Sequence, residues 1–509
     1  MESVSDESTL KSEVKISTNA AKWTLLSVWV KRLLGLVSTL VLVRYLTPTD
    51  LGIAISAMIV LMFAQAVTEA GSRQYIIQQD NLNHEQISCA WTISLILKLV
   101  ASSLIIIASL FADRIFDSEK MASVLLVCSA VPLLIGLKNP GLFIDEKNDQ
   151  YKTLNILPVI SKICALPVTI GIAIVYETYW SLIIGSLLET TIEVLLSYRY
   201  NKFTPKLTLI GYKRQLKFSN YFFVMSIFGY LRSRLENFAI IALFGVKGNG
   251  LYSIAQEIAF LPMTEIVQPI QRGFHSTAAR LKSQKQQMFE LYAKQSNWVL
   301  LILLPCFFGL LAVQDLFTAV VLGANWVEAG QIMPIFTATT IPFSLYLLII
   351  LILTIENKFK YIIAIDVTYS IVLAVTTYYI DHFNLVYFTT YRALLSFVIF
   401  GYYLVVIRAL YQINILFLLK ALPAITFCAG AMYAVIMLLR AQISDISQLL
   451  QLLILITSGI LIYSSLLYAV CRATYKNNAR ISEILEIYHA VGNFVNGKLK
   501  ANSLTKDRE

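Results

Sequence analysis

The sequence predicts an all-α polytopic membrane protein with about 14 transmembrane helices, and three observations support this fold class. Hydrophobic residues make up 57% of the 509 residues and charged residues only 14%, well below the roughly 25% of a soluble protein. The mean hydropathy is +0.68. The apolar residues also come in blocks of about 20, the length that a helix needs to cross a bilayer.

Fourteen such blocks follow one another along the chain. The eighth is the least regular, because it carries Glu257 and Glu265 and because Pro262 and Pro269 are expected to kink it. The predicted spans cover residues 23–46, 51–70, 89–111, 121–140, 154–176, 180–198, 220–244, 250–271, 297–322, 333–355, 361–380, 385–407, 417–439 and 449–470.

The distribution of lysine and arginine predicts the orientation. An even number of spans places both termini on one side, and lysine and arginine collect on the cytoplasmic side of membrane proteins. Of the 41 Lys and Arg residues, 29 lie in or beside the segments on the side of the termini, and five lie on the other side. We therefore expect both termini in the cytoplasm. The net charge of +10 needs no nucleic-acid partner to explain it.

A weak internal repeat predicts two lobes. The motif GIAISA begins at residue 52 and GLYSIA at residue 250, each after a short turn, and each preceding span carries a pair of cations. Transporters are often built from such duplications. The predicted organisation is a cytoplasmic tail (1–22), an N-lobe of six spans (23–198), a basic cytoplasmic linker (199–219), a C-lobe of six spans (220–410), two further spans (411–470) and an amphipathic cytoplasmic C-tail (471–509).

Several kinds of site are not predicted. The six cysteines form no C-x-x-C pair, and the four histidines lie outside the apolar blocks, so we expect neither a metal site nor a cofactor. The pattern G-x-x-x-x-G-K-[ST] of nucleotide-binding loops is absent. A transporter of this kind would be secondary, driven by an ion gradient, by membrane potential or by consumption of its product.

Three segments carry a resemblance to a known family. They are RYLTPTDLGI (44–53), GLYSIAQEIAFLPMTEIVQPIQRGFHSTAARL (250–281) and VLGANWVEAG (321–330). In order and spacing they resemble the polysaccharide-transporter, or Wzx-type, flippases of the multidrug/oligosaccharidyl-lipid/polysaccharide exporter superfamily. Lipid-linked cell-wall precursor flippases and multidrug (MATE-type) exporters share this fold.

The resemblance implies a function. A member of this family would be a multi-pass protein of the bacterial inner membrane that moves an undecaprenyl-diphosphate-linked oligosaccharide to the periplasmic leaflet, for exopolysaccharide, capsule or O-antigen (lipopolysaccharide) synthesis. It would alternate between inward- and outward-facing states around a cationic cavity between its lobes. Membrane lipids, the polysaccharide polymerase and the export machinery would be its other partners.

The predicted substrate-binding residues are the cations of spans one and seven: Lys31, Arg32, Arg234 and Arg232. Charge inside a membrane span is costly and usually functional, and arginine suits phosphate through its planar fork. Arg232 is the weaker candidate because Glu236, four residues on, shares its helix face. The other three have no acid within one turn. The alternative is structural pairing or snorkelling of these side chains to the interface.

Carboxylates within or at the ends of spans supply the other candidates. Glu69, Glu236 and Asp366 could couple transport to protons or ions, because a carboxyl in an apolar site changes its proton load readily, but each could equally be an ion-pair partner. Lys162 and Glu189 have matched depths in spans five and six, which predicts a structural salt bridge, shared with Glu193. No residue is predicted to be catalytic.

Two other functions stay open. One is a secondary multidrug or small-molecule exporter of the same fold. The other is a membrane polysaccharide polymerase or ligase, a class that usually carries a large hydrophilic catalytic loop on the outer side. The short predicted outer loops, YETYW, IDHFN and LGANWVEAGQ, argue against the enzyme.

Overall fold

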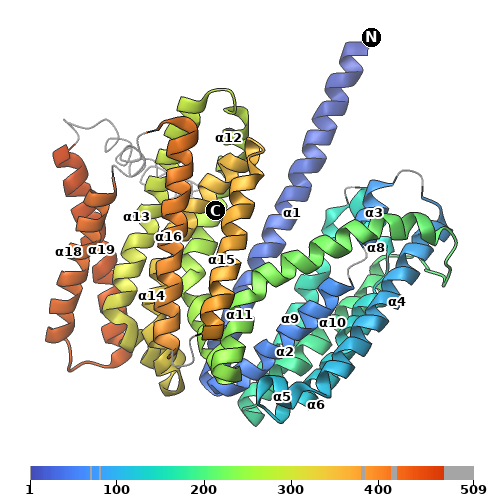
Figure 1. The fold of residues 1–509 in the computed structure, drawn as a ribbon, viewed down its shortest axis with the longest axis horizontal. Coiled ribbons are helices and arrows are strands. Elements are labelled where there is room, and N and C mark those ends of the chain that lie inside the picture. Colours follow the sequence, from blue (N-terminus) through green and yellow to red (C-terminus); the bar gives the residue numbers. More distant parts are fainter. Residues whose placement is uncertain are drawn as a thin grey trace, which may run out of the picture. The chain divides into compact units, whose positions relative to one another are not determined.

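The computed structural model describes residues 2–68, 71–79, 82–148, 150–379, 384–413 and 421–474, and every regular element in these ranges is helical (Figure 1). The chain forms two compact units. Unit 1 comprises Met1–Ser253 with Val372–Asp381, and unit 2 comprises Ile254–Ile371 with His382–Glu509. The boundary therefore follows Ser253, and the predicted linker at 199–219 lies within unit 1.

In the part of the chain that the structure describes, unit 1 contains ten helices and most of an eleventh. They are α1 (Glu2–Tyr45), α2 (Pro48–Val67), α3 (Ser72–Gln78), α4 (His84–Ser109), α5 (Ala112–Phe116), α6 (Lys120–Cys128), α7 (Ala130–Gly136), α8 (Gly141–Lys147), α9 (Tyr151–Tyr176), α10 (Trp180–Tyr200) and α11 (Tyr212–Pro262), whose last residues belong to unit 2. Residues 2–22, predicted to be an N-terminal tail, thus form the first part of α1 in the structure.

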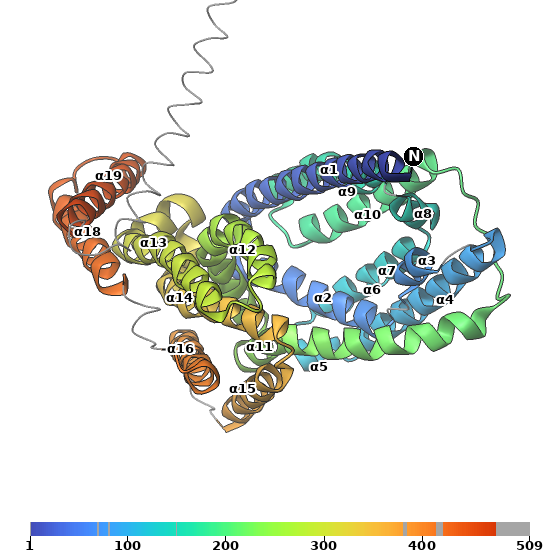
Figure 2. The ribbon, with the colours of Figure 1, turned by 90° about the horizontal axis from the view of Figure 1, so that it is seen from above.

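The helices of unit 1 pack in two groups. Helix α9 packs along both α1 and α10, whereas α4 packs on α6 and α7. Figure 2 shows α1, α9 and α10 on one side of this unit and α11 on the other, with α2 between them. The α9–α10 contact is close, because a Cβ added to Gly185 would lie 2.1 Å from Thr169 Oγ1. Glycine at this position lets the two helices approach.

The first residues of the two repeat motifs, GIAISA and GLYSIA, contact each other in unit 1. A Cβ added to Gly52 would lie 1.8 Å from the carbonyl oxygen of Val246, and one added to Gly250 would lie 2.1 Å from that of Pro48. The first turns of the two repeat motifs therefore cross backbone against backbone. Gly245 breaks α11 just before this crossing, with φ 62° and ψ −167°, a conformation that glycine adopts without strain.

A buried polar network supports the crossing. The Asn249 side-chain amide donates to Ser56 Oγ at 3.0 Å, and the Asn237 amide donates to Asn249 Oδ1 at 3.2 Å. All three residues are buried. A hydrogen bond removes the cost of placing such polar groups in an apolar interior, so the network fixes α2 against both parts of α11.

Unit 2 contains the remaining helices around a large apolar core. After the end of α11 come the π-helical segment η1 (Met263–Val267), α12 (Gln268–Arg280), α13 (Lys285–Phe317), the π-helical η2 (Thr318–Leu322), the 3₁₀ segment η3 (Ala324–Trp326), α14 (Val327–Ile355), α15 (Phe359–Tyr379, whose end belongs to unit 1), α16 (Leu385–Tyr411), α18 (Leu422–Gln442) and α19 (Gln448–Thr474). The irregular η1 lies between Pro262 and Pro269, where a kink is predicted.

The number of spans is the main difference from the prediction. By length and composition, the described residues contain 12 helices able to cross a membrane, or up to 13 if the bent pair Lys120–Gly136 and Gly141–Lys147 forms one span, so a count of 14 is not confirmed. One difference is this bent pair, where the span 121–140 is predicted. The other is Ser233–Arg280, which counts as one 48-residue helix where the spans 220–244 and 250–271 are predicted. At ~1.5 Å per residue it would be much longer than the ~30 Å hydrocarbon layer, and it is broken at Gly245.

Candidate functional site

The predicted cation Arg234 lines a recess of about 420 Å³ in unit 1. Helix α2 contributes Met62, Gln65 and Ala66, and α11 contributes Ser226, Gly229, Tyr230, Ser233 and Arg234. The TPTD sequence positions α2, because Thr47 caps its N-terminus, accepting from the Asp50 amide, and the Asp50 carboxylate accepts in return from the Thr47 amide. Such a capping box satisfies backbone donors that the helix leaves open.

The Arg234 side chain is half-buried, and within the described residues no acid forms an ion pair with it. Its Nη2 donates to Met62 Sδ at 3.6 Å, and none of the ion pairs within the described part of the chain includes it. The Tyr230 hydroxyl beside it donates to the carbonyl of Ile59. A guanidinium has five donors, so this recess can offer most of them to an anion.

The other predicted cations divide among different surroundings. Lys31 and Arg32 lie on α1 and both are half-buried. Arg232 is on α11, but its side chain lies outside the described residues, so its pairing with Glu236 stays a prediction. Lys31 and Arg234 belong to the same unit, but α1 and α11 lie on different sides of it (Figure 2).

Charged residues of α1, α9 and α10 meet near Glu189. The positive charges of Lys162 and Lys31 act favourably on the Glu189 carboxylate, and the charge of Glu193 acts unfavourably. The predicted Lys162–Glu189 salt bridge is not among the ion pairs within 4.0 Å in the described ranges. Glu193 instead pairs with Lys138, at 2.5 Å. Sequence reasoning missed this partner because Lys138 comes from the loop after α7.

The three predicted coupling carboxylates belong to different parts of the chain. Glu236, in unit 1, accepts a hydrogen bond from the Tyr252 hydroxyl at 3.2 Å. Asp366 is half-buried on α15, in unit 2. Glu69 lies outside the described residues. A coupling role for any of them stays a prediction.

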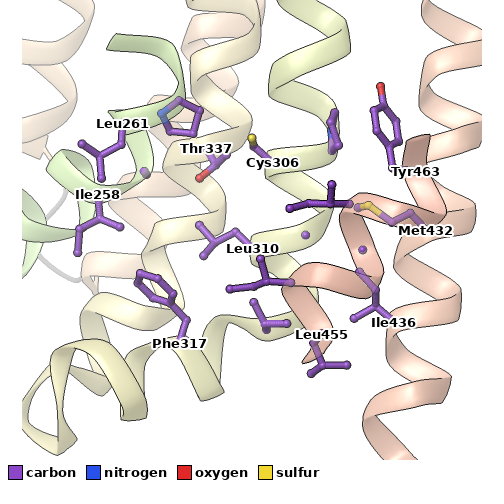
Figure 3. Close-up of a pocket in the computed structure, with 18 of the residues that line it drawn as sticks. Ile258, Leu261, Cys306, Leu310, Phe317, Thr337, Met432, Ile436, Leu455 and Tyr463 are labelled. Atoms are coloured by element: carbon purple, nitrogen blue, oxygen red, sulfur yellow. The ribbon is translucent and has the colours of Figure 1, made fainter. Parts of the chain in front are cut away.

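Unit 2 contains an apolar cavity of about 530 Å³ that the sequence did not predict. It lies among the end of α11, α13, α14 and the two C-terminal helices α18 and α19. Figure 3 shows Ile258 and Leu261 on one side of this space, and Met432, Ile436 and Tyr463 on the other. Gly309 and Gly459 also line it, and their missing side chains leave room.

Two of the few polar side chains that line this cavity, Thr337 and Tyr463, form hydrogen bonds to nearby backbone carbonyls. The Thr337 hydroxyl donates to the Met333 carbonyl at 3.0 Å, and the Tyr463 hydroxyl donates to the Leu301 carbonyl at 3.1 Å. A ligand there would meet almost only apolar surface, and 530 Å³ is within the ~300–1,000 Å³ of ligand pockets. The sequence gave only an indirect signal for this cavity. It predicted two spans beyond the two six-helix lobes, residues 411–470, and assigned them no role.

Comparison with known proteins defines the class and then the family. The fold is similar to that of "Lipid II flippase MurJ, inward closed conformation", with 14% identity and a TM-score of 0.68 over 90% of this chain and 100% of that one. An inward-facing multidrug resistance MATE family transporter of the MOP superfamily gives 13% identity and a TM-score of 0.55, over 74% of this chain and 95% of that one.

The family model described as "Polysaccharide biosynthesis protein" matches residues 41–331, more than half of the chain, and the chain therefore belongs to this family. Among its curated relatives are "Lipopolysaccharide biosynthesis protein WzxC" of Escherichia coli (strain K12), 20% identical over 60% of this chain, and "Teichuronic acid biosynthesis protein TuaB" of Bacillus subtilis (strain 168), 19% identical over 62%. The matches span 63% and 66% of those two proteins, slightly less than two thirds. The predicted family resemblance is confirmed.

Proposed function

We propose that this protein is a secondary transporter that moves an undecaprenyl-diphosphate-linked oligosaccharide across the bacterial inner membrane for exopolysaccharide, capsule or O-antigen synthesis. The observation that carries the proposal is the Arg234 recess: a cation without an acidic ion-pair partner in the described chain, on a membrane-spanning helix. A charge in this position is costly unless water or an anion solvates it, and a diphosphate is such an anion.

The lining of the recess suits a sugar diphosphate. The Arg234 guanidinium can donate two parallel hydrogen bonds to phosphate oxygens. Gln65, Ser226 and Ser233, which line the same recess, carry amide and hydroxyl groups that bond to sugar hydroxyls. A multidrug exporter that takes hydrophobic cations would be disfavoured here, because the resident charge repels them.

The apolar cavity of unit 2 suits the other half of such a lipid. An isoprenoid chain has no polar atoms. Transfer of such a chain from water into an apolar cavity is favourable by about 25 cal/mol per Å² of buried surface. In a bilayer the gain is smaller and comes from packing and shape. We assign this cavity to part of the polyprenyl tail.

The orientation and cycle also belong to the proposal. Both termini lie in the cytoplasm, as the 29-to-5 distribution of basic residues favours. The protein alternates between states open to either side. Lys31 and Arg32 would act with Arg234 on the anionic headgroup, and Arg232 would assist.

The test removes charge in cells. The gene is deleted and re-expressed with Lys31→Ala plus Arg234→Ala, and polymer at the cell surface is measured together with the amount of protein in the membrane. We expect normal insertion and loss of surface polymer. A matched control is Arg408→Ala, at the exposed end of α16, which should leave polymer unchanged.

Two outcomes would contradict the proposal. Unchanged polymer at normal protein levels would remove the assigned role of these cations. Normal polymer in the deletion strain itself, combined with increased sensitivity to toxic organic compounds, would favour a small-molecule exporter.

A further inference from the structure

We propose that Lys31 and Lys162 form an anion-binding pair in unit 1, and that Glu189 is their exchangeable counter-ion, displaced and protonated when a lipid diphosphate binds. This inference rests on the proposed function, since it assigns a second contact for the same headgroup. It adds two residues, Lys162 and Glu189, that neither the proposed recess nor the family comparison assigns.

Two contacts place Lys31 and Lys162 at similar heights on adjacent helices. The Ser27 hydroxyl donates to Asn155 Oδ1 at 3.2 Å, which joins α1 to α9. Further along both helices, a Cβ added to Gly35 would lie 3.3 Å from Lys162 Nζ. The two helices therefore run parallel and in contact, and Lys31, between Ser27 and Gly35, lies about one turn from the level of the Lys162 ammonium.

A third contact fixes the height of Glu189. Thr169 of α9 meets Gly185 of α10, and the chain turns back between these helices, so they run antiparallel. Glu189 comes four residues after Gly185, so it lies level with Ala165, four residues before Thr169. Ala165 is three residues from Lys162, or ~4.5 Å along the helix axis. The Glu189 carboxylate thus lies within the field of both lysines.

The contrast with Glu193, one turn further along α10, shows what is unusual about Glu189. Glu193 is held by Lys138 at 2.5 Å. Glu189 belongs to none of the ion pairs within 4.0 Å among the residues that the structure describes, although two ammonium groups act on it. A direct bond keeps a counter-ion in place, whereas Glu189 neutralises the lysines from a distance and can give way to a closer anion.

Among the residues that the structure describes, three charged side chains act on Glu189. Helix α9 brings Lys162, α1 brings Lys31, and α10 itself brings Glu193, already paired with Lys138. Helices α7, α6 and α2 also pack on α10, and α7 carries no charged residue. Lys120 of α6 lies over the Tyr179 ring, ten residues before Glu189, and Asp50 of α2 is engaged by Thr47.

The charges balance in both states. The empty site carries two ammonium groups and one carboxylate, a net charge of one positive unit. A sugar-linked diphosphate diester brings two negative charges, so the loaded site would be negative unless Glu189 accepts a proton from water. Because an uncompensated charge in a membrane interior is costly, binding of the lipid draws a proton onto Glu189. The reciprocal effect is that protonation of Glu189 favours binding.

The experiment measures proton uptake on binding. Full-length protein in nanodiscs is titrated with farnesyl-diphospho-glucose by calorimetry, in buffers of different ionisation enthalpy. This probe carries two charges throughout the range from about pH 6 to about pH 8, because phosphodiester groups titrate far below it. We expect the wild-type protein to take up about one proton per lipid and to bind about tenfold more tightly at the lower pH, the effect of a one-unit pKa difference.

The variants separate the roles. Glu189→Gln should bind tightly at both pH values with no proton uptake, and Lys31→Met or Lys162→Met should weaken binding. Glu193→Gln, the matched control one turn away, should keep the proton uptake. Proton uptake that persists in Glu189→Gln would overturn the inference, as would wild-type binding without any uptake.

These failures differ from a failure of the proposed function. If wild-type protein binds farnesyl-diphospho-glucose no better than farnesyl glucoside, which lacks the diphosphate, the proposed substrate class is wrong. If it prefers the diphosphate, and Arg234→Gln removes that preference while Glu189→Gln changes nothing, the proposed function stands and only the counter-ion is rejected.

Discussion

The Arg234 recess of unit 1 and the apolar cavity of unit 2 have similar volumes, about 420 and 530 Å³, and opposite chemistry. In the recess the guanidinium of Arg234 contacts only Met62 Sδ among the hydrogen bonds of the described chain. In the cavity the hydroxyls of Thr337 and Tyr463 bond to nearby carbonyls. The recess keeps the donors of a charged guanidinium available, whereas the cavity is lined almost entirely by apolar side chains. A lipid with an anionic headgroup and a hydrocarbon tail needs both kinds of surface.

The largest loss of stability and transport is expected at the close crossing of α2 and α11, the two helices that line the recess. Gly52→Ala places a Cβ 1.8 Å from the Val246 carbonyl oxygen, so α2 and α11 must separate, which costs at least ~1–3 kcal/mol and distorts the recess that they line. We expect a lower melting temperature and little transport. Gly171→Ala on α9, where a Cβ meets nothing within 4 Å, is the control; equal behaviour of both variants would contradict the close crossing.

The next effect should distinguish the recess from the cavity. Arg234→Gln removes a charged donor, and a hydrogen bond to a charged group contributes ~1.5–3 kcal/mol, so affinity for a prenyl diphosphate should fall about tenfold or more. Affinity for a prenyl alcohol should not change. The measurement is a binding titration of both lipids in nanodiscs, with Arg408→Gln as control. Equal losses for both lipids would mean that the recess does not recognise the diphosphate.

Filling the cavity should have the converse effect. Gly309→Leu adds an isobutyl group where the nearest side-chain atom, Met432 Cε, is 3.9 Å from the new Cβ, so the protein should fold. Transport of a long-chain lipid should fall severalfold, and binding of a short prenyl diphosphate should change little. Gly401→Leu, on α16 with nothing within 4 Å, is the matched control. Unimpaired transport by Gly309→Leu at normal protein levels would leave the cavity without the assigned role.

The smallest effect concerns the frame of unit 2 and its pH dependence. At the end of α14, Glu356 accepts from the Tyr411 hydroxyl at 2.5 Å and pairs with Lys358 at 3.0 Å. Burial alone would raise the pKa of Glu356, but the hydrogen bonds from Tyr411 and Lys358 and the nearby positive charges outweigh it, so its pKa is lowered.

A carboxylate with a lowered pKa in the folded state stabilises it above the ordinary glutamate pKa of about 4.3, and this stabilisation is lost as the pH falls through the folded value. We therefore expect Glu356→Gln to lower the melting temperature near pH 7 and to match the wild type at acid pH. A constant difference at every pH would contradict this.

The sequence predicted most of the fold because its signals are local. Apolar blocks set the helices, the GIAISA and GLYSIA motifs marked the two glycines that cross, and Pro262 and Pro269 marked the irregular region around η1. The count of spans was not confirmed, because hydropathy does not decide whether a helix broken at Gly245 crosses once or twice.

The sites were less predictable because they depend on packing. Same-helix spacing gave Arg234 as a cation without an acid nearby; no ion pair of the described chain includes it, and its binding role stays a prediction. It also gave Lys31 no partner, yet Glu189 on another helix acts on it. Glu193 pairs with Lys138 rather than with the predicted Lys162, and a cavity lies beside α18 and α19. Both features depend on tertiary contacts, which residue spacing along one helix does not predict.

Photo-crosslinking tests the pairing of the two surfaces most directly. A polyprenyl diphosphate with a photoreactive group at the end of its tail is bound to the protein in nanodiscs, and the labelled peptides are identified. We expect labels on α13, α18 and α19 at the cavity, lost in Gly309→Leu and much reduced in Arg234→Gln. Labels spread over the outer surfaces of the helices, and unchanged in both variants, would contradict the account.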